Sequence, residues 1–251
     1  MMLPEANLLA LLLAAPCFGS FAGLLAERLP AGRPVLLDRS RCAACGTVLG
    51  WRDLVPVLSW LAGRGRCRHC GAAIGEAPLL FELAALLVAV WAASLGSGWQ
   101  MWATAGLGWT LLVLAVIDQR HMVLPDVLTL PLIPAGLLVT ALALPDRLLD
   151  HALGAASGWA AFAALAWSYR RLRGREGLGA GDAKLLGAAG AWLGWEALAS
   201  VVLLAAVSGL TLALLAALRE GRLDHARPLP FGPHLCLGFW LVRLYGPLLP
   251  G

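Results

Sequence analysis

Two aspartates stand where apolar segments of the sequence begin or end. Asp182 lies in Gly179-Ala180-Gly181-Asp182, at the start of an apolar segment and just after the arginine-rich stretch 170–175. Asp118 closes the apolar run 111–117. An ionisable group where the chain enters a bilayer is costly and is by default a functional candidate. Two carboxylates at one membrane face would form a dyad of the aspartic-protease type, in which one is ionised and the other protonated.

Asp182 also has a structural interpretation, whereas Asp118 has none. Asp182 would cap the helix that follows it, with Lys184 neutralising its charge, and the flanking glycines would be close helix-packing contacts. Asp118 has no such role, because the macrodipole disfavours an anion at the carboxyl end of a helix. The placement of Asp118 at the same predicted face strengthens the catalytic interpretation of Asp182.

Other polar residues near the apolar segments have simpler explanations. Asp126 follows Pro125 and precedes an apolar run, which predicts a helix N-cap. Glu82 lies one turn into an apolar segment, where it would pair with a loop arginine or else face an active cleft. Arg120 and His121 are interpreted as basic residues of a cytoplasmic loop.

Four cysteines predict a structural metal site. Cys42 and Cys45 form one CxxC pair and Cys67 and Cys70 another, and a glycine follows each pair. Two such knuckles supply four thiolates in a tetrahedral array for zinc, which leaves no open position for catalysis. The alternative is two disulfides, which rarely persist in the reducing cytoplasm that this loop is predicted to face. His69, inside the second knuckle, is expected to be exposed rather than a ligand.

The composition indicates what must position these residues. Of the 251 residues 60% are hydrophobic and 14% are charged, against about a quarter charged in soluble domains. The mean hydropathy is +0.77, so the class is a polytopic membrane protein. The net charge of +4 comes from arginines in loops, with Lys184 the one lysine, which indicates membrane topology rather than nucleic-acid binding.

The segment 1–15 resembles a signal peptide but lacks its basic start, so we expect an uncleaved first helix with its amino end outside.

Eight apolar segments suggest membrane spans, which need roughly 20 residues each, although the sixth is short and rich in glycine. They are placed at about 5–27, 78–96, 99–118, 126–145, 150–169, 181–196, 197–218 and 230–248. Alternation then assigns four segments to the cytoplasm, namely 28–77, 119–125, 170–180 and 219–229. These carry most of the arginines, whereas Arg147 alone lies in an outer loop. The predicted fold is an all-α polytopic membrane protein of about eight transmembrane helices with a small cytoplasmic zinc-knuckle domain. Its expected parts are the first transmembrane helix (1–27), the zinc-binding loop domain (28–77) and the transmembrane peptidase core (78–251).

In this order the motifs resemble the type IV prepilin peptidase family, bifunctional leader peptidase/N-methyltransferases of bacterial inner membranes. The resemblance extends over essentially the whole chain. It includes the stretches Gly19-Ser20-Phe21, Arg28-Leu29-Pro30, the two knuckles, 55–61, 65–70, Ile117-Asp118, Leu124-Pro125-Asp126 and 179–185. The sequence departs from the family pattern at Ala22-Gly23, where an asparagine is usual, and at Glu76-Ala77-Pro78, where Arg-Tyr-Pro is usual.

The resemblance implies that Asp118 and Asp182 are the catalytic pair of an intramembrane aspartic endopeptidase. The implied substrates are type IV prepilins and type II secretion pseudopilins, cut after a glycine at the cytoplasmic border of the inner membrane. S-adenosylmethionine is implied as the methyl donor for the new amino terminus. The expected partners are these substrates and lipid, with no nucleic acid. Two alternatives are a zinc-stabilised membrane scaffold for a secretion or pilus machine and an ion-coupled transporter, although a transporter would place its acids near mid-membrane.

Overall fold

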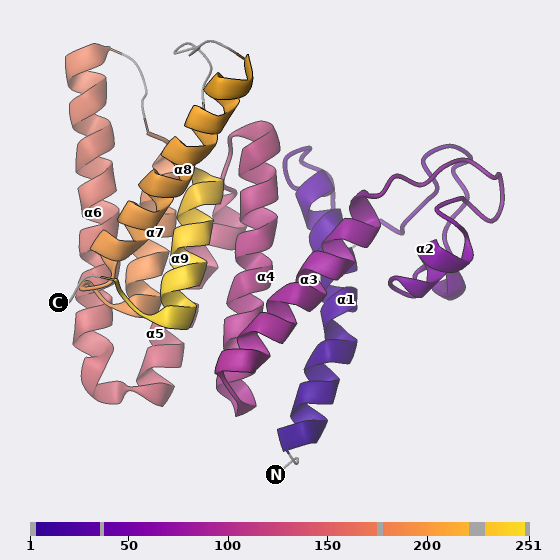
Figure 1. Cartoon of the computed structure of the whole chain (residues 1–251), viewed down its shortest axis with the longest axis horizontal. Helices are drawn as coiled ribbons and strands as arrows, with labels where there is room; N and C mark the ends of the chain where they lie inside the picture. Colours follow the sequence, from indigo (N-terminus) through magenta and orange to yellow (C-terminus); the bar gives the residue numbers. More distant parts are fainter. Residues whose placement is uncertain (1–3, 36–37, 175–177, 221–228, 249–251) are drawn as a thin grey trace. The chain divides into compact units, whose positions relative to one another are not determined.

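The computed structural model describes residues 4–35, 38–174, 178–220 and 229–248, and their regular structure is helical apart from two isolated β-bridges. Figure 1 labels the α-helices and colours them along the chain, from indigo at the N-terminus to yellow at the C-terminus. Their bounds are α1 (Pro4–Arg28), η1 (Trp51–Asp53), α2 (Leu58–Ala62), α3 (Ala77–Leu95), α4 (Gly98–His121), α5 (Asp126–Ala143), η2 (Pro145–Arg147), α6 (Leu148–Arg173), α7 (Ala180–Leu193), α8 (Leu198–Glu220) and α9 (Gly232–Tyr245).

An α-helix lies in each of the eight predicted spans, but not every one is long and apolar enough to cross a bilayer. Among the described residues five helices are long and apolar enough, namely α1, α3, α4, α5 and α8. Helices α7 and α9 have 14 residues each, about 21 Å at a rise of about 1.5 Å per residue, against a hydrocarbon core of about 30 Å. Helix α6 has 26 residues, but its interior is rich in alanine and glycine instead of leucine. The number of eight spans therefore stays a prediction, and most of the predicted cytoplasmic segment 219–229 lies outside the described residues.

By its internal contacts the chain forms two compact units, 1–113 and 114–251. In the first unit α1 packs along α3 through small residues. A Cβ added to Gly19 would lie 2.5 Å from the Cα of Glu82. Alanines of both helices are fully buried at this contact, and small side chains are what allow membrane helices to approach closely. The cysteine-bearing loop belongs to the same unit, and the finer division expected at 27 and 77 stays a prediction.

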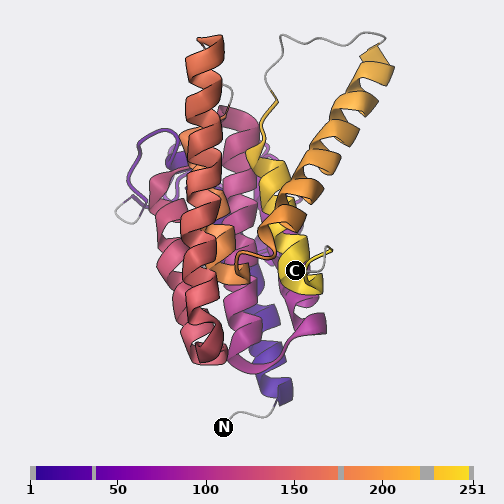
Figure 2. The ribbon, with the colours of Figure 1, turned by 90° about the vertical axis from the view of Figure 1, so that its left-hand side faces the viewer.

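The second unit is organised around α7, which contacts α5, α6, α8 and α9. Its contact with α6 uses glycine on both sides, because a Cβ on Gly190 would overlap the carbonyl of Gly154. At the far end of α7 the Nδ1 of His151 lies 2.9 Å from the hydroxyl of Thr140 and 3.0 Å from the carbonyl of Ala191. These hydrogen bonds join α5, α6 and α7, so the short α7 is fixed by its neighbours. Figure 2 shows α6 from the side, with α8 running obliquely to it.

Candidate active site and metal centre

Asp118 lies in the last turn of α4 and is 6% exposed. The backbone N–H of Gly232, the first residue of α9, donates a hydrogen bond of 2.9 Å to its Oδ2. The first N–H groups of a helix have no partner within the helix and carry the positive end of its dipole. The amino end of α9 therefore offsets the unfavourable position of Asp118 at the carboxyl end of its own helix.

Asp182 lies in the first turn of α7 and is 8% exposed. Its Oδ2 accepts a hydrogen bond of 3.2 Å from the N–H of Gly179, the N-cap residue. The predicted capping role is thus partly right, because the carboxylate closes the first turn from within the helix. Gly181 lets this turn approach the α4–α5 connection, since a Cβ there would lie 2.7 Å from the Cβ of Leu124.

The structure brings the two predicted acids into one buried neighbourhood within the second unit. The charge of Asp118 acts on Asp182, and both charges act on the fully buried thiol of Cys236 in α9. The ends of α4, α7 and α9 therefore meet at the carboxylates. Like charges held close disfavour the doubly ionised state of two carboxylates.

Lys184 and Asp126 form an ion pair of 2.6 Å between Nζ and Oδ1. Two predictions are corrected here. Lys184 does not neutralise Asp182, because residues two apart on a helix do not face each other. Asp126 is not the N-cap of α5, since Pro125 takes that position and makes no side-chain capping bond. The ion pair instead ties the start of α5 to the start of α7.

Glu82 is 5% exposed, and its partners are not the predicted loop arginine. One oxygen accepts a hydrogen bond from the hydroxyl of Ser20 in α1, and the other accepts one of 2.6 Å from the N–H of Val57. Val57 has φ +62°, an outlier for a β-branched residue. Glu82 thus holds a strained turn of the cysteine-bearing loop against α1 and α3.

The two CxxC pairs form two copies of one turn. In the first, the N–H of Cys42 donates to the carbonyl of Thr47, and in the second the N–H of Cys67 donates to the carbonyl of Ala72. An antiparallel bridge closes each turn, between Arg41 and Val48 and between Arg66 and Ala73. Gly46 and Gly71 have φ +70° and +73°, a conformation that glycine adopts without steric cost. This explains the glycine after each pair.

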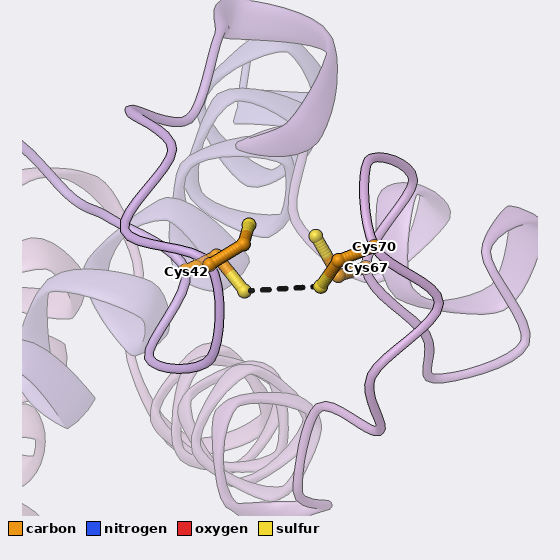
Figure 3. Close-up of side chains that lie close together, drawn as sticks. Cys42, Cys67 and Cys70 are labelled. Atoms are coloured by element: carbon orange, nitrogen blue, oxygen red, sulfur yellow. Dashed lines mark hydrogen bonds between the residues drawn. The ribbon is translucent and has the colours of Figure 1, made fainter.

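The four sulfurs lie within 4.8 Å of one another, and those of Cys42 and Cys70 are 3.8 Å apart (Figure 3). A tetrahedron with zinc–sulfur bonds of about 2.3 Å has edges of about 3.8 Å, so the donor set fits zinc. All six cysteines are free thiols, so the disulfide alternative gains no support. His69 faces Asp53, with 3.9 Å between its Nε2 and the carboxylate, and it is half exposed as expected.

These features define a helical membrane protein with a buried carboxylate pair and a four-cysteine centre. Residues 105–214 match the model of the type IV leader peptidase family, and residues 13–95 match the bacterial peptidase A24 N-terminal domain. The chain belongs to the type IV leader peptidase family.

Several relatives are named prepilin leader peptidase/N-methyltransferase. The protein of Burkholderia pseudomallei (strain 1026b) is 46% identical over 221 residues, which cover 88% of this chain and 71% of the relative. That of Aeromonas hydrophila is 42% identical, with coverage of 84% and 73%. That of Pseudomonas aeruginosa is 36% identical, with coverage of 89% and 77%. No solved structure gives a significant match.

Sequence reasoning missed Gly232. Its signal is local and weak, a glycine in Pro230-Phe231-Gly232-Pro233 at the start of an apolar run. Nothing in that run indicates that its N–H meets a carboxylate 114 residues away.

Proposed function

We propose that the protein cleaves the leader peptides of prepilins with Asp118 and Asp182 as its catalytic pair. The observation that carries this proposal is the pair itself: two buried carboxylates, close enough to interact, at the ends of membrane helices. Position at the helix ends suits a substrate whose scissile bond lies at the membrane border. It disfavours the transporter alternative, whose acids would lie near mid-membrane.

The chemistry follows from sharing one proton between two carboxylates. The ionised carboxylate takes a proton from water as the oxygen attacks the scissile carbonyl, and the protonated one donates its proton to the carbonyl oxygen. The tetrahedral intermediate then collapses as the carbon–nitrogen bond breaks, and a carboxylic acid gives its proton to the leaving amine. The backbone bonds of Gly232 and Gly179 both engage Oδ2, which leaves Oδ1 of each aspartate for water and substrate.

Zinc is proposed as a structural ion held by Cys42, Cys45, Cys67 and Cys70. Four protein ligands complete its coordination, so it would stabilise the loop and take no part in cleavage.

The loop and the catalytic pair are proposed to face the cytoplasm of a bacterium with an inner membrane, as the arginine distribution indicates. Pseudopilins of type II secretion are proposed as substrates of the same class.

A second reaction is proposed, N-methylation of the amino terminus that cleavage exposes, with S-adenosylmethionine supplying the methyl group. Methyl transfer needs an oriented donor and a deprotonated amine but no aspartate pair. Among the described residues of the first unit Glu82 is the one buried acid, and its two oxygens accept hydrogen bonds from Ser20 and Val57. Glu82 therefore serves the structure, and no residue is assigned to the methyl donor.

The test is to incubate the detergent-purified protein with a full-length prepilin, with and without S-adenosylmethionine, and to determine the product's amino terminus by mass spectrometry. Leader removal without the methyl donor, and a gain of one methyl group with it, are expected. An intact leader after incubation with folded protein would contradict the peptidase proposal and favour the scaffold alternative.

A further inference from the structure

Gly232 and Asp118 are hydrogen-bonded, and the Asp118 carboxylate also occupies the space where a side chain at position 232 would begin. A Cβ built on Gly232 would lie 2.6 Å from Oδ2 and 2.8 Å from Cγ of Asp118. Cβ atoms essentially never come this close to other heavy atoms, so any other residue would displace either the carboxylate or the start of α9. The φ of Gly232 is not in the left-handed region, so the requirement for glycine here is one of space.

The amino end of α9 is held firmly by its neighbours in the second unit. The ring of Phe231 lies 6.2 Å from that of Phe162 in α6, and His234 Nδ1 lies 3.1 Å from the hydroxyl of Ser208 in α8. Leu235 and Phe239 are fully buried. The N–H of Gly232 is therefore a fixed donor, and α9 cannot easily shift to make room for a larger residue.

We propose that Gly232 is a positioning residue of the catalytic pair, which holds Oδ2 of Asp118 with its N–H and leaves the space that the carboxylate occupies. By fixing Oδ2, it directs Oδ1 toward water and the scissile carbonyl. This inference rests on the proposed peptidase activity. It predicts that a methyl group added at Gly232 lowers kcat because it displaces the Asp118 carboxylate, and not because it shifts α9 against its neighbours.

Gly238, in the same helix, offers a matched control. A Cβ there would lie 2.5 Å from the carbonyl of Val201 in α8, a similar overlap that involves no residue of the catalytic pair. Gly232→Ala should lower kcat for prepilin cleavage by about 100-fold, the effect of displacing a reacting group by about 1 Å, with little change in KM. Gly238→Ala should lower the melting temperature by at least as much while keeping kcat within about threefold of the unmutated protein. Near-normal kcat in Gly232→Ala, or an equal loss of kcat in both variants, would overturn the proposal.

A double-mutant cycle tests the contact without reference to activity, even if Gly232→Ala folds poorly. In an Asp118→Ala background the added methyl meets no carboxylate, so Gly232→Ala should lower the melting temperature much less there than in the unmutated protein. Equal losses in the two backgrounds would overturn the assignment. If the unmutated protein fails to cleave prepilin while the cycle shows coupling, the proposed function fails and the contact stands.

Discussion

At the scale of single residues, the two aspartates are both buried and both accept a backbone hydrogen bond, but different parts of the chain position them. Asp182 is placed locally, within the turn that its own carboxylate closes. Asp118 depends on Gly232, far away in the sequence. The sequence suffices to select both acids, because an acid at the end of an apolar run is conspicuous. The donor that stabilises Asp118 belongs to another helix, and no local pattern predicts it.

Asp118→Asn and Asp182→Asn should each lower kcat for prepilin cleavage by about 10²–10⁴-fold or more, because each removes half of an acid–base pair. The mass-spectrometric assay above measures this, and unchanged melting curves would show that both variants fold. Asp126→Asn is the control, since it removes only a partly exposed ion pair with Lys184 worth at most about 1 kcal/mol. An inactive Asp126→Asn beside an active Asp118→Asn would mean that the pair is wrongly assigned.

Glu82→Ala should destabilise the first unit, because it leaves the N–H of Val57 and the hydroxyl of Ser20 without their acceptor. A buried polar group left unpaired costs about 1–3 kcal/mol, and these two groups are partly buried, so each should cost about 1 kcal/mol. Glu76→Ala is a suitable control, as Glu76 is exposed and makes no capping bond at the start of α3. Thermal unfolding in detergent compares the two variants, and equal melting temperatures would show that Glu82 does not hold the loop.

At the scale of elements, sequence predicts the long helices well and their packing poorly. Runs of apolar residues locate α1, α3, α4, α5 and α8, since few other structures satisfy the backbone in a bilayer. The short α7 and α9 also fall within predicted spans, but their length depends on Gly179 and Phe231 as N-caps and on tertiary contacts. Glycine pairs such as Gly154 and Gly190 are equally unforeseen, because their partners lie on other helices.

The two CxxC knuckles are the elements that the sequence predicts most completely. They lead to a prediction about zinc content. Purified protein should contain about one zinc per chain, and a strong chelator, or Cys42→Ser combined with Cys67→Ser, should unfold the loop first, because structural zinc contributes folding free energy. Metal analysis and hydrogen exchange over 38–76 measure this. Cys17→Ser is the control, since Cys17 lies in α1 apart from the four-sulfur cluster. Carefully purified, folded protein without zinc would contradict the assignment.

At the scale of the whole molecule, the candidate groups divide between the two compact units. The four cysteines and Glu82 lie in 1–113, and both aspartates lie in 114–251. The two family matches follow nearly the same division, at 13–95 and 105–214. The sequence separates the four cysteines from the two aspartates, but it places Glu82 with the aspartates in 78–251. The boundary between the two units falls inside α4 and has no local signal. This division motivates the view that cleavage and methylation use different residues.

Methyl transfer to a pre-cleaved pilin should therefore survive Asp118→Asn, because deprotonating an amine and orienting a methyl donor require positioning and a base rather than two coupled aspartates. It should fall in the Cys42→Ser, Cys67→Ser variant, whose first unit is disturbed, while Cys17→Ser retains it. The measurement is the transfer of labelled methyl from S-adenosylmethionine to the cleaved pilin. If folded Asp118→Asn protein transfers no label while the unmutated protein does, the two reactions share one site and the division of labour between the units is wrong. If the unmutated protein also transfers none, the proposed methylation fails, and the peptidase proposal is unaffected.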